Sequence, residues 1–169
     1  QVRPQDSPSD MDMLAELVAE MEAGEVETLL ILGGNPVFDA PADIDFGAAL
    51  EKVPFSLMLA SAANETSQKT QWLVPRTHFL ESWGDARAHD GTVSIVQPLI
   101  APLHDSISEI ELLATLCDDA KTGYAAVRST WKEKLGERDD DPRWQKAVAD
   151  GIIEASATAT VDLTDDQAP

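Results

Sequence analysis

The residues with the clearest chemical potential form a turn, Gly33-Gly34-Asn35-Pro36, directly after the apolar run Thr28 to Leu32. Glycines let the backbone approach a ligand closely, and the backbone N–H groups of such a turn can face an anion. The spacing matches neither the three-glycine dinucleotide fingerprint nor the Gly-Lys-Ser/Thr of a phosphate-binding loop. Because Gly, Asn and Pro are ordinary turn formers, the turn taken by itself favours a structural role.

A second group of titratable side chains lies in one segment, residues 76–90. Histidine transfers protons near neutral pH, and arginine can clamp a carboxylate or phosphate, so this segment is chemically capable of forming a site. Ion pairs that order a long loop are the commoner use of such residues, and they imitate functional sites. We therefore favour the structural interpretation. The group consists of Arg76, His78, Glu81, Asp85, Arg87, His89 and Asp90, with Trp83 among them.

The remaining candidates carry little chemistry. The three histidines and the aspartates at positions 39, 43 and 45 lack the spacing of zinc and calcium sites. No Gly-x-Ser-x-Gly motif is present to expose a serine nucleophile. The single cysteine, Cys117, excludes an intrachain disulfide, a thiolate zinc site and an iron–sulfur cluster. Its place in an amphipathic helix predicts a small, buried apolar group.

An alternation of helices and strands is expected to position the turn. A first helix begins at Ser9 or Asp10, either of which can cap its free N–H groups. The apolar run over 28–32 is typical of a strand covered on both faces. A helix over 43–52 and a strand over 55–59 would complete a crossover unit, which requires parallel strands.

A third, short strand is expected over 71–74 and a fourth strand over 93–96. The segment between them, 76–91, has no usable periodicity and is expected to be an ordered loop. The helices expected after it are one that begins at a capping box of Ser106 and Glu109, one over 124–135, and one over 142–149 with Asp141 as its cap.

The chain as a whole predicts an α/β fold: a three-layer sandwich with a mostly parallel, Rossmann-like sheet, plus C-terminal helices. Residues 1–8 are expected to be a linker, 9–153 one domain, and 154–169 a disordered tail rich in Ala, Thr and Asp. Because the chain opens at Gln1 without an initiator methionine, we expect a piece cut from a larger protein.

Charge excludes several classes of partner. The 169 residues include 12 Lys and Arg against 31 Asp and Glu, a formal net charge of -19. Such an excess repels a nucleic-acid backbone and an anionic bilayer, so we expect no nucleic-acid partner. No run approaches the roughly 18 apolar residues of a membrane span, and we expect no direct membrane insertion.

Several short motifs, taken in order, resemble the third domain of the molybdopterin-dinucleotide oxidoreductases. That family has a Gly-x-Asn-Pro turn after a strand, a Glu-Thr pair after the next strand, and a short strand ending in Leu-Pro. The resemblance covers roughly residues 25–150, and His89-Asp90-Gly91 stands where the family has Asn-x-Glu-Gly. The motifs are Leu30 to Pro36, Asn64-Glu65-Thr66, Leu73-Val74-Pro75, Phe79 to Gly84, and Asp90-Gly91-Thr92.

The resemblance implies which residues would border the guanosine and phosphate part of a pterin dinucleotide. The stretch Ser67-Gln68-Lys69-Thr70 departs from the family, which has an Ala-rich, Asp-bearing segment there. The metal-ligating residue of the family belongs to another domain. We therefore expect no cofactor in this fragment, no catalysis by it in isolation, and vestigial binding positions. These positions are Gly33, Gly34, Asn35, Pro36, Glu65 and Thr66.

The segments Trp83 to Arg87 and Val96 to Pro102 are most similar to a narrower branch. This branch is the iron–sulfur fusion subunit of alternative complex III, labelled a Tat-translocated molybdopterin oxidoreductase, which keeps the fold without the molybdenum cofactor. In that branch iron–sulfur clusters of a separate domain carry the electrons. The resemblance implies a scaffold domain on the periplasmic side of the membrane, partnered by other domains of its chain and by quinol-oxidising membrane subunits.

Two alternatives stay open. The chain could be the domain of a catalytic molybdenum or tungsten oxidoreductase that holds half of a bis-pterin cofactor. It could also be an unrelated acidic interaction domain whose likeness to the family is coincidental.

Overall fold

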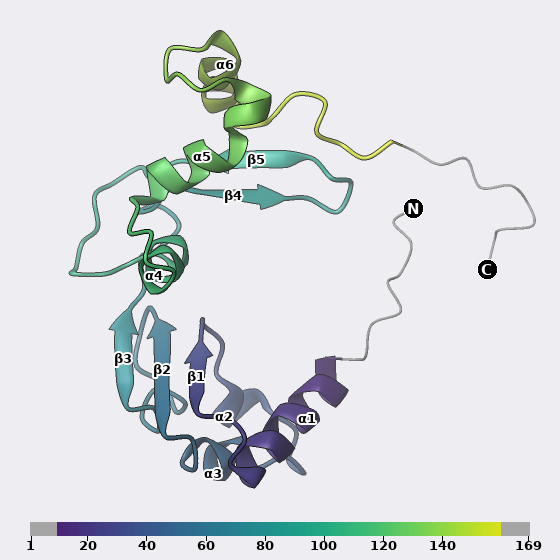
Figure 1. Cartoon of the computed structure of the whole chain (residues 1–169), viewed down its shortest axis with the longest axis vertical. Coiled ribbons are helices and arrows are strands. Elements are labelled where there is room, and N and C mark those ends of the chain that lie inside the picture. The colour runs from purple at the N-terminus through teal and green to yellow at the C-terminus, as the bar shows by residue number, and fades with distance from the viewer. Residues whose placement is uncertain (1–9, 160–169) are drawn as a thin grey trace, which may run out of the picture.

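The computed structural model describes residues 10–159, so the predicted linker over 1–8 and the tail beyond 159 lie outside the described residues. Helices and strands alternate only as far as residue 60; strands then follow one another to residue 96, and the remaining elements of the described chain are helices (Figure 1). The helices are α1 (Asp10–Ala23), α2 (Pro36–Asp39), α3 (Phe46–Leu50), α4 (Glu109–Leu116), α5 (Gly123–Leu135) and α6 (Pro142–Asp150). The strands are β1 (Thr28–Ile31), β2 (Phe55–Ala60), β3 (Trp72–Pro75), β4 (Gly84–Arg87) and β5 (Val93–Val96).

A parallel sheet of three strands, in the order β1-β2-β3, forms the first half of the molecule. Thr28 of β1 lies opposite Phe55 of β2, and Leu57 of β2 lies opposite Trp72 of β3. Both pairs are parallel, so the crossover unit predicted between residues 28 and 59 is confirmed. The α/β class is confirmed with it.

The crossover from β1 to β2 differs from the single helix predicted over 43–52. It contains two short helices, α2 and α3. The carboxylate of Asp45 accepts a hydrogen bond from the backbone N–H of Ala48 (2.9 Å), and this cap starts α3 later than predicted. Helix α2 was missed because Pro36 was interpreted as part of a turn, although proline also favours the first position of a helix.

The core of this half lies between the sheet and the helices α1 and α3. Met21 of α1, Ala49 of α3 and Met58 of β2 are fully buried in one hydrophobic cluster. Helix α1 ends where Gly24 adopts a φ of 76°, a left-handed conformation that glycine accepts without strain. The sheet and these helices therefore fix the carboxyl end of β1, where the predicted turn begins.

The second half contains an antiparallel hairpin, β4 paired with β5, in a sheet of its own. The strand predicted over 93–96 is therefore confirmed as β5. The prediction of a loop over 76–91 is wrong for residues 84–87, which form β4. The sequence of β4, Gly84-Asp85-Ala86-Arg87, has no run of large apolar residues and gave no strand signal. The connection from β4 to β5 is too short for the crossover that parallel strands need.

Helices α4, α5 and α6 complete this half. The capping box of α4 uses Ser108 and Glu111, two residues later than predicted. Helix α6 follows the prediction at both ends, with Asp141 as its cap and Gly151 left-handed beyond its last residue. A second hydrophobic cluster joins the hairpin to α5 and α6, and its buried members are Val93, Ile95, Val127, Leu135, Trp144, Ala147 and Ile153.

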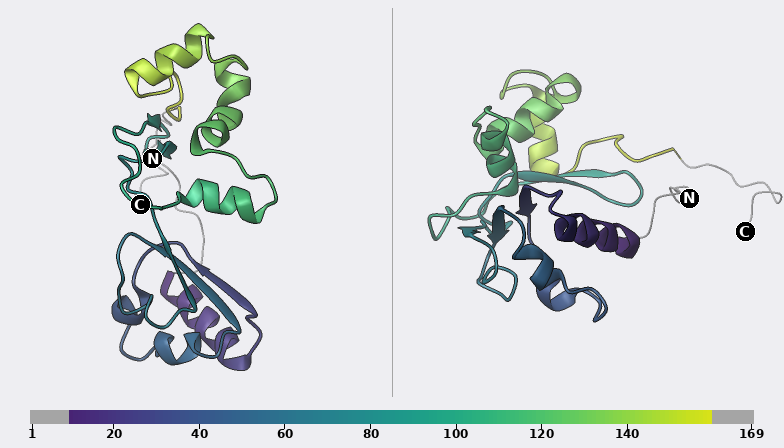
Figure 2. Two further views of the ribbon diagram at one scale, coloured as in Figure 1. Left: turned by 90° about the vertical axis from the view of Figure 1, so that its left-hand side faces the viewer. Right: turned by 60° about the horizontal axis from the view of Figure 1, so that its bottom comes forward.

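The two halves follow one another along the long axis of the molecule, as Figure 1 and the left view of Figure 2 show. They meet where Thr77 donates its backbone N–H to Ile107 (3.1 Å) and Ile107 donates to Pro75 (3.0 Å). Within the described residues, this bridge is the main-chain pairing on the outer edge of β3, and Trp72 of that strand is 60% exposed. No described helix is long and apolar enough to cross a membrane.

Candidate functional site

The predicted turn lies at the carboxyl end of β1, the edge at which open α/β sheets bind ligands. Gly33 has a φ of 99° and Gly34 a φ of 76°, which are conformations that residues with a Cβ rarely adopt. The chain then enters α2 at Asn35, and Pro36 occupies the first turn of that helix. The two glycines therefore serve the sharp bend from strand to helix.

The side chain of Asn35 connects this turn to the loop that follows β2. Its amide Nδ2 donates a hydrogen bond to Oε2 of Glu65 (2.7 Å). Its Oδ1 accepts hydrogen bonds from the hydroxyl (2.8 Å) and the backbone N–H (3.2 Å) of Thr66. The hydroxyl of Thr66, which is fully buried, accepts a further hydrogen bond from the backbone N–H of Val37 (3.0 Å).

Asn64 gives the second loop its shape. Its backbone N–H and side-chain oxygen exchange hydrogen bonds with the hydroxyl and backbone N–H of Ser67, at 2.8 and 2.9 Å. Its Nδ2 donates to the carbonyl of Gly34 (3.2 Å). The predicted residues from 33–36 and 65–66, although some 30 positions apart, are thus gathered at one edge of the sheet. Asn64 belongs to this cluster too, although only its neighbours were predicted as site residues.

Glu65 and Arg76 are charged residues at this edge of the sheet. The hydrogen bond from Asn35 and that from its own backbone N–H lower the pKa of Glu65, which lies at the surface. Arg76 follows β3, and its Nη1 would lie 3.1 Å from a Cβ placed on Gly33. Its Nη2 forms an ion pair with Glu109 (2.8 Å). Sequence reasoning assigned Arg76 to the loop group, although its place directly after a parallel strand indicates this edge.

The other loop residues have structural partners. The carboxylate of Glu81 accepts hydrogen bonds from the backbone N–H groups of His78 (2.8 Å) and Leu103 (3.1 Å), which lower its pKa. Asp85 accepts from the indole N–H of Trp131 (2.6 Å). Asp90 accepts from the backbone N–H of Thr92 (2.9 Å). These contacts hold the loop and hairpin in place rather than directing several groups toward one point.

Two further predictions concern metal and thiol chemistry. Among residues 10–159, no group of three or more His, Cys, Asp or Glu side chains is arranged to hold a metal ion. Cys117 is exposed, so the prediction of a buried cysteine is wrong. It occupies the C-cap position of α4, where the helix ends and leaves the hydrophobic core.

Comparison with known proteins gives one informative match. No family model matches the chain. The chain is 29% identical over 101 residues to the menaquinone reductase, molybdopterin-binding-like subunit of Nitratidesulfovibrio vulgaris. The match covers 57% of this chain and 15% of that protein, so the chain spans a small part of its relative. This similarity supports a relationship to molybdopterin-oxidoreductase-like proteins.

A pterin dinucleotide would have to be held by the six predicted residues at this edge of the sheet. A Cβ on Gly34 would meet only Pro36, at 4.0 Å, whereas the space beside Gly33 is occupied by the guanidinium of Arg76, at 3.1 Å. The side chains do not fit, because the polar groups of Asn35 and Thr66 are already bonded to each other and to Glu65 and Val37. The cavity of about 310 Å³ that Arg76 lines contains none of the six residues. The side chains of Asn35 and Thr66 therefore serve to join the two loops.

Proposed function

We propose that the chain is part of the large subunit of a bacterial respiratory protein with a molybdopterin-oxidoreductase-like fold. In this proposal it takes part in quinol-linked electron transfer as a scaffold domain without a redox centre of its own. The observation that carries the proposal is the network that joins Asn35 to Glu65 and Thr66. It uses the side chains that would face a cofactor to tie the end of β1 to the loop after β2.

Burial strengthens this argument. The hydroxyl of Thr66 has no exposed surface, and it donates to Asn35 while accepting from Val37. A ligand that recruited Oδ1 of Asn35 would leave this buried hydroxyl without its acceptor. Such a loss typically costs about 1–3 kcal/mol, which a ligand would have to offset.

The intact protein would work in a complex. We propose other domains of its own chain and quinol-oxidising membrane subunits as its partners, on the periplasmic side of the membrane, as in the alternative complex III branch. The similarity to a menaquinone reductase subunit supports a quinone-linked complex. Affinity purification of the tagged parent protein from host membranes, with protease accessibility in spheroplasts, tests this placement. Purification without membrane subunits, or protection from external protease, would contradict it.

A second candidate function is cofactor binding in a catalytic molybdenum or tungsten oxidoreductase. The observation that favours it is the pair of left-handed glycines at the carboxyl end of β1, beside the guanidinium of Arg76. Together they would present backbone N–H groups and a positive charge to a phosphate.

Calorimetric titration of the chain with guanosine diphosphate at low salt separates the two functions. The scaffold proposal expects no heat of binding up to about 1 mM nucleotide, a limit near the weak end of measurable affinities. Submillimolar, salt-sensitive binding that disappears in Asn35→Asp and persists in Asp43→Asn would instead establish the cofactor-binding function. The control variant changes a carboxylate on the same crossover, outside the network.

A further inference from the structure

The two faces of the parallel sheet are covered unequally. Side chains alternate between the faces along each strand, and residues paired between parallel strands share a face. Ile31 of β1 is paired with Met58 of β2, and both belong to the hydrophobic cluster that also contains residues of α1 and α3. The right view of Figure 2 shows α1 and the crossover from β1 to β2 on the same side of the strands. These helices therefore cover one face of the sheet.

The opposite face is apolar and partly exposed. Leu30 of β1, Leu57 of β2 and Trp72 of β3 form one row across it, because Leu57 is paired with both of the others. Phe55, two residues before Leu57, lies on the same face. Phe55 is 40% and Trp72 60% exposed, and none of the four side chains belongs to either hydrophobic cluster of residues 10–159. We call the surface of Leu30, Phe55, Leu57 and Trp72 the open face.

The chemistry of the open face limits what can cover it. Strands β1, β2 and β3 contain no charged residue. Parallel sheets occur almost only in proteins that cover both of their faces, and the covering elements are helices. A helix with an apolar stripe, laid along the strands, would bury the row from Leu30 to Trp72. The open face is thus suited to a helix rather than to a charged surface.

Charge and length indicate where this helix comes from. A second copy of the chain is disfavoured, because each copy carries a net charge of -19 and the two would repel each other. The same charge attracts a helix that has Lys or Arg beside its apolar stripe. The region that matches this chain makes up 15% of the menaquinone reductase subunit of Nitratidesulfovibrio vulgaris, so most of that polypeptide lies outside the match. A parent polypeptide of similar length would have ample chain to supply the helix.

We propose that a helix from the rest of the parent polypeptide, with an apolar stripe flanked by basic residues, packs on the open face and forms the second helical layer of the sheet. The inference rests on the proposed function in one respect, that the chain is part of a longer polypeptide. It requires neither quinol chemistry nor the membrane subunits.

Hydroxyl-radical footprinting tests whether the open face is covered. It compares the chain of 169 residues with the parent protein purified without membrane subunits. Phe55 and Trp72 should be oxidised at least about fivefold more slowly in the parent, as expected for side chains in the buried centre of an interface. Phe38 of α2, which is 71% exposed and outside the open face, is the internal control and should keep its rate. Unchanged oxidation of Trp72, or equal protection of Phe38, would overturn the proposal.

Photo-crosslinking in the same parent protein identifies the occupant. Benzoylphenylalanine in place of Trp72 should form a link to a helix of the same polypeptide, with Lys or Arg beside the linked residue. The same group in place of Phe38 is the matched control and should not form this link. A link between two copies of the chain, or to a segment other than a helix, would overturn the proposal. Co-purification of the parent with membrane subunits while Trp72 stays unprotected would contradict this proposal alone and leave the proposed function in place.

Discussion

The bend after β1 depends on residues that accept unusual backbone conformations. Gly34 has a φ of 76°, and a Cβ placed there would meet only Pro36, at 4.0 Å. Space is therefore not the constraint at this position, and any cost of a larger residue comes from backbone strain. A substitution at Gly34 therefore measures the cost of backbone strain without a steric clash of the added Cβ.

We expect Gly34→Val to lower the free energy of unfolding by about 1–3 kcal/mol, because a β-branched residue is strained at positive φ. Chemical denaturation followed by circular dichroism measures the change. Gly84→Ala is the matched control, because its added Cβ would make an ordinary 3.9 Å contact with Val96. That control should change stability by less than about 0.5 kcal/mol. Equal stability of Gly34→Val and the unmodified chain would refute the argument from strain.

Glu65 gives the network a pH dependence with a definite sign. Its hydrogen bond from Asn35 lowers its pKa in the folded chain, whereas the unfolded chain keeps the ordinary value. The stabilisation is therefore fully present above the ordinary carboxyl pKa and is lost as pH falls through the lowered value.

Asn35→Asp should reverse this dependence, because it removes the donor and places a second carboxylate beside Glu65. We expect its melting temperature to fall by several degrees at pH 7 and the difference from the unmodified chain to shrink toward pH 4. Thermal melts between pH 3 and 8 provide the measurement. A difference that is constant over this range would show that the two carboxylates do not interact.

At the residue level, the residues predicted as a site lie together at one edge of the sheet. The turn over 33–36 could be named because turn-forming Gly, Asn and Pro follow an apolar run, whereas Glu65 and Thr66 were named from the family resemblance. The hydrogen bonds that the Asn35 side chain makes with Glu65 and Thr66 could not be predicted, since they depend on where two loops meet in space. The exposure of Cys117 was missed because the end of α4 was not located to the residue.

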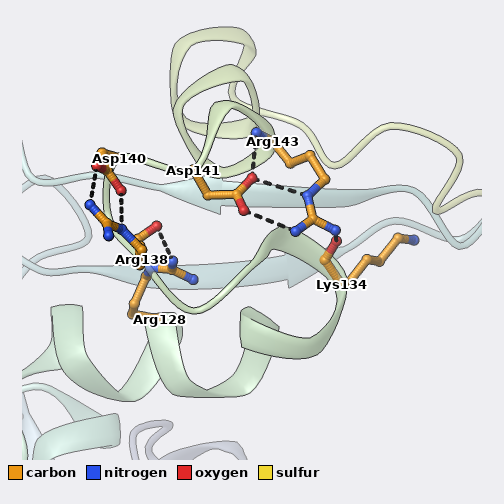
Figure 3. A network of polar contacts seen from close by, with 6 residues as sticks. All are labelled: Arg128, Lys134, Arg138, Asp140, Asp141 and Arg143. Carbon is orange, nitrogen blue, oxygen red and sulfur yellow. Dashed lines mark hydrogen bonds and ion pairs between the residues drawn. The ribbon is translucent and has the colours of Figure 1, made fainter.

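At the scale of the secondary-structure elements, the connection between α5 and α6 contains a glycine, Gly136, whose lack of a side chain leaves room for an ion pair. Gly136 ends α5 with a φ of 85° and a ψ of 162°. A Cβ on Gly136 would lie 1.9 Å from Oδ2 of Asp141, which is the cap of α6. Arg143 lowers the pKa of Asp141 to about 2, so this carboxylate remains charged in all but strong acid. The glycine thus leaves the space that the Asp141–Arg143 pair occupies (Figure 3).

Gly136→Ala should therefore displace Asp141 and raise its pKa toward the ordinary value, and it should destabilise the chain more than Gly151→Ala. Gly151 also has a positive φ, 73°, but a Cβ there would meet nothing within 4 Å. The second variant should cost only the left-handed strain, about 1–2 kcal/mol. Carbon-detected titration of Asp141, with denaturation of both variants, checks the pair. Identical behaviour of the two variants would rule out the proposed displacement.

Periodicity predicted the elements that are buried and regular, and it failed for those set by tertiary contacts. Helix α6 was predicted closely because Asp141, Pro142 and Gly151 mark both of its ends locally. Strand β4 gave no signal, since it is a strand by virtue of pairing with β5. The capping box of α4 was misplaced by two residues because Ser106 and Ser108 both precede a glutamate at the right spacing.

At the scale of the whole molecule, residues 10–159 form two separate hydrophobic clusters, one around Met58 and one around Trp144. The described contacts between the halves include the pairing of Thr77 with Ile107 and the ion pair of Arg76 with Glu109. These contacts are few and partly exposed compared with either cluster. The single domain predicted over 9–153 therefore contains two separately packed clusters.

We expect the clusters to unfold as two units. Leu135→Ala, at a site that is 5% exposed, should destabilise the second cluster by about 2–5 kcal/mol and speed amide exchange in β4, β5 and α5. Exchange in β1 and β2 should change little. Leu50→Ala in the first cluster is the matched variant, and it should give the opposite pattern. Acceleration of both halves by either substitution would indicate one cooperative domain.

The outer edge of β3 has a consequence for the colloidal behaviour of the purified chain. At neutral pH a net charge of -19 keeps molecules apart, but this repulsion vanishes near the isoelectric point of about 4.2. Trp72 and Leu73, 60% and 40% exposed, would then be available for edge-to-edge association, which sheet proteins commonly block with lysine. Light scattering should thus show turbidity near pH 4.2 that Trp72→Lys reduces and Phe38→Lys, on α2, does not.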